Sequence, residues 1–389
     1  MNSPVKPKAI VAGYIVRYPQ AGNALSQLDY LIGLHRLGYD VLFVEHHGWP
    51  EACYDADRRT MTDDPRYGIR VLQDLFAGAG LRHWCYVAPN DQYFGLSQSE
   101  LRQWCAEAEL LLSVAATTWV EEFRECRQRV FIDTDPVFTQ LRMPARPTPS
   151  QPGFASPWDF QHHFTLGELL HAPGCPVPLH GLKWRPTRWP LIADRYTPQF
   201  TPDAPLFTTV MSWDAYGAVT HNGETYGQKD VEVLRFLDLP QQAGAVFELA
   251  LGGKAAPLEK LQAAGWHTRP AGSVTGLAKE YLGYIGQSRG EFSFAKNGYV
   301  KARTGWFSER TLKYLACGKP AIVQDTGFSE LLPTGRGIFA FQDTAGVCAA
   351  VEALQADYAA HCAAARDWVC AHFDYRPVLG QLLAAVGLR

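Results

Sequence analysis

The fold is decided by the stretch Trp306-Phe-Ser-Glu-Arg-Thr-Leu-Lys-Tyr-Leu-Ala-Cys-Gly-Lys-Pro-Ala-Ile-Val-Gln-Asp-Thr-Gly-Phe-Ser-Glu330. Ser308 is a favourable N-cap for a short amphipathic helix, and a Gly-Lys-Pro turn ends that helix. The apolar run 321–323 then predicts a strand buried between two layers. Gly327 lets the backbone approach another group closely, and we expect a second helix N-terminus near Ser329. Because N–H groups at helix N-termini bind anions, the stretch predicts a ligand-binding corner.

Strand and helix patterns alternate along the rest of the chain. A length of 389 residues favours two domains. Repeated βα units with short connections predict two Rossmann-like, doubly wound parallel sheets. A helix is expected over 120–128, and a last helix with a break at Pro377. The predicted organisation is an N-terminal domain 1–188, a proline-containing hinge 189–202, a C-terminal domain 203–366 and a final helical segment 367–389.

Composition excludes several classes of protein. The formal net charge is −3, and no lysine- or arginine-rich block stands out, which argues against an extensive nucleic-acid-binding surface. No run of eighteen apolar residues and no signal-peptide pattern occurs, so we expect a cytoplasmic chain without a transmembrane segment. The nine cysteines are scattered, and no metal-ligand spacing is present, so neither a disulfide framework nor a metal site is expected.

The run Leu315-Ala-Cys-Gly-Lys-Pro-Ala-Ile-Val323, followed by Gly327 and Glu330, resembles the nucleotide-sugar corner of the GT-B glycosyltransferase superfamily. It is similar to the "glycosyl transferases group 1" type of C-terminal domain. The related retaining enzymes usually carry two glutamates eight residues apart, where this chain has Gly305 and Lys313. The resemblance implies two Rossmann-like domains facing a cleft and transfer of a sugar from a nucleotide-diphosphate sugar to an acceptor hydroxyl, without a metal or a resident cofactor.

The donor side is expected at the start of the decisive helix and at neighbouring strand ends. Arg310 suits a diphosphate because its planar guanidinium donates two parallel hydrogen bonds. The resemblance implies that Lys229, shortly after the first strand of the second domain, contacts the diphosphate. The alternative interpretation is that these charges form ordinary solvated first turns of helices. The expected donor-binding residues are Lys229, Lys296, Ser308, Glu309, Arg310, Thr326, Gly327 and Glu330.

The catalytic candidates lie in the first domain, Asp135 and His46 at strand ends and His163 in a later loop. Asp133 and Asp135 follow an apolar strand, and the carboxyl ends of parallel strands face the ligand. Asp135 is a candidate general base, or alternatively a cap of the turn before proline. His46 and His163 are further candidates for proton transfer, and a hydrogen-bonded structural histidine is the alternative for each. The loop with Gly22 and Asn23 is expected on the acceptor side.

Three other functions compete with glycosyl transfer. Gly22 and Glu45 are spaced like the turn and the ribose-binding acid of a dinucleotide fold, but G-x-G-x-x-G is absent, so the NAD-dehydrogenase signal is weak. A sugar-nucleotide epimerase would need the same donor corner without an acceptor pocket. A non-catalytic nucleotide-binding module is the third alternative. The expected partners are a UDP-, GDP- or dTDP-sugar and a small-molecule, glycan or lipid-linked acceptor.

Overall fold

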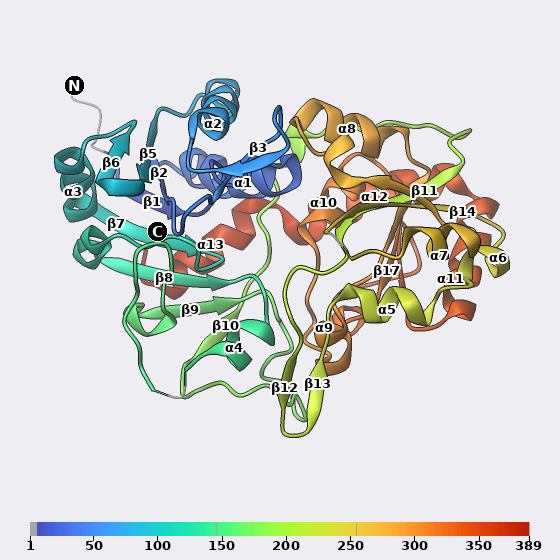
Figure 1. The fold of residues 1–389 in the computed structure, drawn as a ribbon. Coiled ribbons are helices and arrows are strands. Elements are labelled where there is room, and N and C mark those ends of the chain that lie inside the picture. Colours follow the sequence, from blue (N-terminus) through green and yellow to red (C-terminus); the bar gives the residue numbers. More distant parts are fainter. Residues whose placement is uncertain (1–5, 145, 254, 389) are drawn as a thin grey trace.

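Two parallel sheets organise the chain in the computed structural model, which describes residues 6–144, 146–253 and 255–388 (Figure 1). In the first sheet only β6 runs antiparallel to its neighbour. Its spatial order is β10 (Trp184–Pro186), β9 (His162–Thr165), β8 (Gln128–Asp133), β7 (Ala108–Val114), β1 (Lys8–Ala12), β2 (Asp40–His46), β5 (His83–Ala88) and β6 (Gln92–Phe94).

All neighbouring strands of the second sheet are parallel. Its spatial order is β15 (His267–Pro270), β14 (Val246–Gly252), β11 (Leu206–Ser212), β16 (Gly290–Ser293), β17 (Ala321–Gln324) and β18 (Ile338–Phe341). Counted in chain order this is 3-2-1-4-5-6, the order of a Rossmann fold. The predicted pair of doubly wound sheets is therefore confirmed.

Helices connect the strands, and two short hairpins stand outside the sheets. The hairpins are β3 (Cys53–Asp55) with β4 (Thr60–Thr62) and β12 (Val219–His221) with β13 (Glu224–Tyr226). The α-helices are α1 (Ala21–Arg36), α2 (Arg66–Ala79), α3 (Gln98–Glu107), α4 (Phe138–Arg142), α5 (Lys229–Arg235), α6 (Leu239–Gln242), α7 (Leu258–Ala263), α8 (Ala278–Gln287), α9 (Asn297–Ala302), α10 (Glu309–Ala316), α11 (Thr344–Ala356), α12 (Tyr358–Phe373) and α13 (Tyr375–Ala385). The 3₁₀ turns are η1 (Pro89–Asp91), η2 (Glu121–Glu125), η3 (Pro157–Asp159), η4 (Ala193–Arg195), η5 (Ala271–Ser273) and η6 (Phe328–Glu330).

The decisive stretch folds as α10, β17 and η6. Ser308 caps α10 by accepting a hydrogen bond from the Arg310 N–H at 3.2 Å, as predicted. β17 is buried throughout, also as predicted. The second helix N-terminus expected near Ser329 is wrong, because only the three-residue η6 forms there. The Asp325 carboxylate turns the chain by accepting from the Gly327 N–H at 2.9 Å and the Ser329 hydroxyl at 2.9 Å.

Two other element predictions need correction. The helix expected over 120–128 is only η2, since the chain must be extended again where β8 begins to pair with β7 at Gln128. The last helical segment breaks at Asp374, which caps α13 through the Arg376 N–H, and Pro377 lies inside the first turn of α13. Proline is tolerated there because first-turn N–H groups have no intrahelical partner.

The C-terminal helix returns to the first domain. In Figure 1 the red segment around α13 lies in the blue and green half of the molecule. A Cβ atom built on Gly33 of α1 would lie 2.5 Å from Leu379 of α13, so the two helices pack in close contact. One continuous cluster of buried apolar side chains contains residues of both sheets and of α13. None of the described helices is long and apolar enough to cross a membrane.

Candidate active site between the two sheets

The switch point of the second sheet carries three cationic side chains. It lies between β11 and β16, where connections leave the sheet in opposite directions and ligands bind at the carboxyl edge. Lys229 begins α5 after the β11 loop, Lys296 follows β16, and Arg310 lies in the first turn of α10. Positive charge therefore gathers at the edge where a doubly wound sheet binds its ligand.

Lys229 is the least compensated of these cations. Its pKa is lowered to about 7, first by burial and then by repulsion from Arg310 and Lys296. Glu309 and Glu291 raise the pKa only in part. Burial and repulsion thus disfavour the charged form of Lys229. A bound anion would stabilise that ammonium ion.

Two hydrogen bonds within the second domain fix the Arg310 side chain. Its Nε donates to the Glu291 carboxylate at 2.6 Å and its Nη1 to the Val210 carbonyl at 3.0 Å. Arg310 is 6% exposed and Glu291 is fully buried. Two of the five guanidinium N–H groups are thus committed inside the domain, and Arg310 shapes the positive edge from a fixed position.

Asp135 joins the two domains. It follows β8, and its carboxylate accepts from the Lys296 ammonium at 2.8 Å and from the hydroxyls of Tyr216 and Tyr299. The Lys296 ammonium also donates to the Tyr216 hydroxyl at 2.5 Å. All three partners come from the second domain, so Asp135 lies where the two ligand-facing edges meet.

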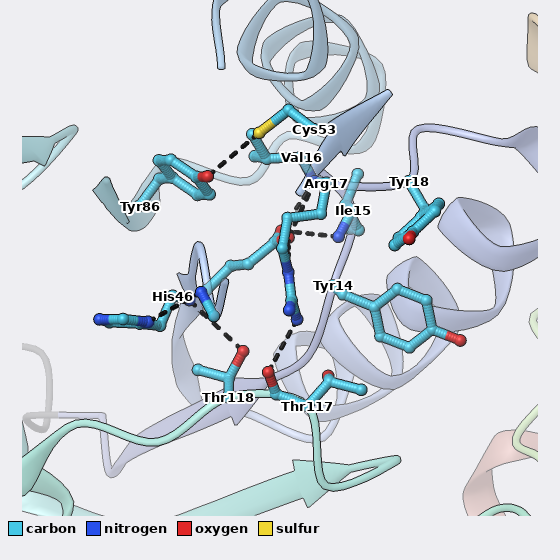
Figure 2. Close-up of polar contacts among 12 residues, drawn as sticks. Tyr14, Ile15, Val16, Arg17, Tyr18, His46, Cys53, Tyr86, Thr117 and Thr118 are labelled. Carbon is cyan, nitrogen blue, oxygen red and sulfur yellow. Dashed lines mark hydrogen bonds and ion pairs between the residues drawn. The ribbon is translucent and has the colours of Figure 1, made fainter. Parts of the chain in front are cut away.

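A buried carboxylate organises the matching edge of the first sheet (Figure 2). Glu45, at the end of β2, accepts from the backbone N–H groups of Ile15 at 2.7 Å, Val16 at 2.7 Å and Arg17 at 2.9 Å. It also accepts from Arg17 Nε at 3.1 Å, and Arg17 Nη2 donates to the Thr117 carbonyl at 2.7 Å. These contacts tie the loops after β1 and β7 to the end of β2. Because Glu45 is fully enclosed, it is not open to a ribose hydroxyl as the dehydrogenase alternative requires.

Comparisons with known proteins agree with this two-domain geometry. Residues 239–384 match the model of a family described as glycosyl transferase-like. No curated protein matches the chain at the level of sequence. An alpha-glucosyltransferase solved with UDP and a 13-mer DNA containing a HMU base is similar in structure, with a TM-score of 0.61 and 10% identity over 98% of this chain and 100% of that chain.

Two further solved structures are similar over nearly the full length. Anabaena Alr3699/HepE, solved with UDP and glucose, has a TM-score of 0.56 and 10% identity, with 98% of this chain and 99% of that chain covered. Sucrose-phosphate synthase from Thermosynechococcus elongatus has a TM-score of 0.53 and 13% identity, with the same two coverages. The chain has the GT-B fold. The family match lies within its second domain, over residues 239–384.

The histidine candidates of this GT-B protein are held by backbone groups. His46 Nδ1 accepts from the Gly48 N–H at 3.0 Å, and burial, with repulsion from His47 and Arg17, lowers the pKa of His46 to about 4. His163, expected in a loop, lies in β9, which pairs with β8; its Nε2 contacts the Pro157 carbonyl at 2.8 Å, and burial lowers its pKa as well. Of the three predicted catalytic residues, only Asp135 is in contact with the cationic edge.

The remaining predicted donor residues separate into two groups. Glu309 lies beside the cations, since its charge raises the pKa of Lys229. Thr326 instead donates to the Trp306 carbonyl at 2.6 Å, and Glu330 forms an exposed ion pair with Arg303. Gly327 has φ of 94°, and a Cβ atom there would lie 2.9 Å from Leu169 of the first domain. The group that the backbone approaches closely at Gly327 is therefore a side chain of the protein.

Gly22 and Asn23 lie at the start of α1, facing the second domain. The Asn23 side-chain amide donates to the Tyr14 carbonyl at 2.6 Å and so fixes the loop after β1. A Cβ atom on Gly22 would lie 3.4 Å from the Tyr281 hydroxyl of α8. The side chain of Tyr14 points away from the Glu45 cluster in Figure 2, and burial, followed by the Glu309 charge, raises its pKa to about 12. The loop therefore borders the space between the domains.

Several residues of the site escaped sequence reasoning. Tyr216 and Tyr299 are not among the predicted site residues. The only signal for Tyr216 is that its loop, 214–228, is rich in tyrosine and glycine. Glu291 is not among the candidates either; it lies within β16, where no local pattern marks it as a site residue. Lys313, where related enzymes have a glutamate, is buried and donates to the Ser26 hydroxyl of α1, which pins the two domains together. Within the described ranges, no group of three or more His, Cys, Asp or Glu side chains is arranged to hold a metal ion.

Proposed function

We propose that this protein transfers a sugar from a nucleoside-diphosphate sugar to an acceptor hydroxyl, and that side-chain cations rather than a metal or a resident cofactor neutralise the diphosphate. The observation that carries this proposal is the uncompensated Lys229 at the switch point, beside Lys296 and Arg310. Solved structures of the same fold contain UDP or UDP-glucose, which supports a uridine nucleotide as the first donor to test.

The donor would lie across the edge of the second sheet. Its diphosphate would contact Lys229 and the N-terminus of α10, which starts at the Ser308 cap. The nucleoside would enter the neighbouring cavity of about 280 Å³, lined by Leu251, by the η5 segment and, across the cleft, by Gln20. As the bond to the sugar breaks, charge grows on the departing diphosphate, and fixed cations stabilise that charge.

Asp135 is the proposed general base. Its carboxylate is held in the cleft by one ammonium and two phenol hydroxyls, and an acceptor hydroxyl would replace one of the tyrosine donors. The acceptor proton would then pass to the Asp135 carboxylate while the acceptor oxygen bonds to the sugar. Tyr216 is the partner more easily displaced, because it belongs to the loop before the β12–β13 hairpin.

Calorimetric titration of UDP tests the donor half of the proposal. Lys229→Met should weaken UDP binding by roughly 1.5–3 kcal/mol, the size of a charged hydrogen bond. Lys301→Met is the matched control, since Lys301 lies on α9 and pairs with Glu224 on the exposed surface. Equal UDP affinity in wild type and Lys229→Met would refute this assignment of Lys229. Binding of NAD(H) with no binding of any nucleoside diphosphate would refute the function.

A further inference from the structure

We infer that a cavity on the carboxyl edge of the first sheet is the acceptor site and that it selects a neutral acceptor presenting a flat ring. This inference rests on the proposed function. The cavity has a volume of about 480 Å³ and lies over the ends of β7 and β8. Its wall includes Trp49, Thr117, Asp135, Phe138, Arg142 and Phe154. Cavities of this size accommodate small molecules of a few rings.

The position of the cavity fits an acceptor hydroxyl. Asp135 lines it, and the same carboxylate pairs with Lys296 of the second domain. The Lys296 charge acts in turn on Lys229, so one chain of charged groups leads from the cavity to the proposed diphosphate site. A hydroxyl bound in the cavity therefore reaches the proposed base from the first-domain side.

Two stacked aromatic rings give the wall a flat apolar surface. The rings of Trp49 and Phe154 are stacked with centroids 5.6 Å apart and an interplanar angle of 27°. The Arg17 guanidinium lies 4.9 Å from the centroid of the Trp49 ring and supports it. Phe154 is nevertheless 56% exposed. An exposed apolar ring held in a fixed plane favours a ligand that covers it with a flat face, whether of a sugar or of an aromatic group.

Unsatisfied and strained groups gather at the same cavity. The Thr117 hydroxyl oxygen is buried and has no hydrogen-bond partner among the described residues. Ala115 and Ala116 have φ values of 65° and 57°, and Val137, beside Asp135, has φ of 77°. Such backbone conformations cost on the order of 1–3 kcal/mol each for residues other than glycine, and they cluster at functional sites.

The charges of the wall exclude an anionic acceptor. Among the described lining residues Arg142 is the only cation, and it is already engaged. Its Nη2 donates to the Gly217 carbonyl at 2.7 Å, and its guanidinium lies 4.0 Å from the centroid of the Tyr216 ring. Asp133 and Asp135 are the wall's two carboxylates. A phosphate group would compete with Asp135 for Lys296 and would meet no free cation among the described lining residues, which disfavours nucleic acid and phosphate-linked lipid as acceptors.

Ligand-observed NMR titrations with matched probes test the inference. Methyl β-D-glucoside and phenol represent the two kinds of neutral ring, and glucose 6-phosphate and phenyl phosphate are their anionic counterparts. We expect saturable binding of at least one neutral probe, tighter than that of its phosphate, and the pair that shows it identifies the ring. Phe154→Ala should weaken this binding roughly three- to tenfold, the energy of an aromatic stacking contact.

Two controls keep the outcome interpretable. Phe200→Ala removes another exposed ring, 59% exposed and stacked on Tyr358 at 5.8 Å, and should leave probe binding unchanged. Titrations with and without UDP separate the proposed donor site from the proposed acceptor cavity. If UDP does not bind, only the donor site is contradicted, and the acceptor cavity is judged on the neutral probes. The inference is overturned if no neutral probe binds saturably, if Phe154→Ala binds as wild type does, or if a phosphate binds more tightly than its neutral partner.

Discussion

The two ligand-facing edges of this molecule have the same topology and opposite chemistry. Both sheets are doubly wound, and each places its loops at the carboxyl ends of its central strands. The second edge carries Lys229, Lys296 and Arg310. The Lys229 ammonium ion is only partly compensated by nearby carboxylates. The first edge carries Asp135, aromatic rings and the enclosed Glu45. One backbone plan therefore presents a cationic edge from the second domain and, from the first, an edge of aromatic rings around Asp135.

The difference shows how a loop can be fixed with or without a ligand. In the first domain, the N–H groups of Ile15, Val16 and Arg17 are satisfied by Glu45, a carboxylate of the protein itself. In the second domain, Glu309 and Glu291 offset only part of the burial and repulsion that disfavour the Lys229 ammonium ion. A protein anion fixes the first loop, whereas the proposed diphosphate would complete the compensation at the second edge.

The largest effect should come from removing the group at the junction of the two edges. Asp135→Asn should lower the transfer rate by about 10²–10⁴-fold, because a carboxamide cannot accept the acceptor proton. UDP affinity should be retained, since the cations stay in place. Single-turnover transfer assays together with UDP titration measure both quantities, and Glu224→Gln at the exposed hairpin is the control. A wild-type transfer rate in Asp135→Asn would show that another residue is the general base.

A second effect should appear in stability rather than in transfer. Arg310→Ala leaves the fully buried Glu291 carboxylate without its partner and should lower the free energy of unfolding by about 3–5 kcal/mol. Arg310→Met combined with Glu291→Leu should recover most of this loss, because apolar side chains of similar volume often replace a buried ion pair without penalty. Urea denaturation measures both variants. Unchanged stability of Arg310→Ala with lost UDP affinity would show instead that Arg310 acts mainly on the donor.

The smallest effect concerns the pH dependence of the cationic edge. The pKa of Lys229, about 7, lies below the ordinary value of 10.5, so its ammonium loses a proton as pH rises above 7. UDP affinity should therefore fall from pH 7 to pH 9 by up to about tenfold per pH unit, and UDP binding should be accompanied by proton uptake. Calorimetry in buffers of different ionisation enthalpy measures that uptake. Lys229→Met should show a flatter profile, and an identical profile in both proteins would contradict the assignment.

The same pKa fixes the sign of the Lys229 contribution to folding stability. Between pH 7 and 10.5 the unfolded chain binds more protons at Lys229 than the folded chain does. The contribution of this group to the free energy of unfolding therefore rises with pH across that window. Comparing wild type with Lys229→Met by thermal unfolding over this range separates the intrinsic effect from that of nucleotide.

Local sequence determined most of the secondary structure. Alternating apolar runs and helical periods predicted the central strands of both sheets, and Ser308 caps α10 as its position indicated. Caps and periodicities act over three or four residues, so the sequence displays them directly. The exceptions, the 120–128 segment and the η6 turn, lie where strand pairing or a side-chain carboxylate overrides the local pattern.

The chemistry of the site was decided by tertiary structure. Sequence singled out Lys229, Lys296 and Asp135 separately, but it did not pair Asp135 with Lys296, 161 positions away, or with Tyr216 and Tyr299. It placed Arg310 either against a diphosphate or in a solvated first turn, whereas the side chain is buried and pairs with Glu291. Pairing between distant side chains depends on how two domains dock, and no local periodicity encodes that. The sequence by itself thus determined two βα sheets and their polar strand ends, whereas only the docked domains decided which of those ends are filled by the protein and which are left for a ligand.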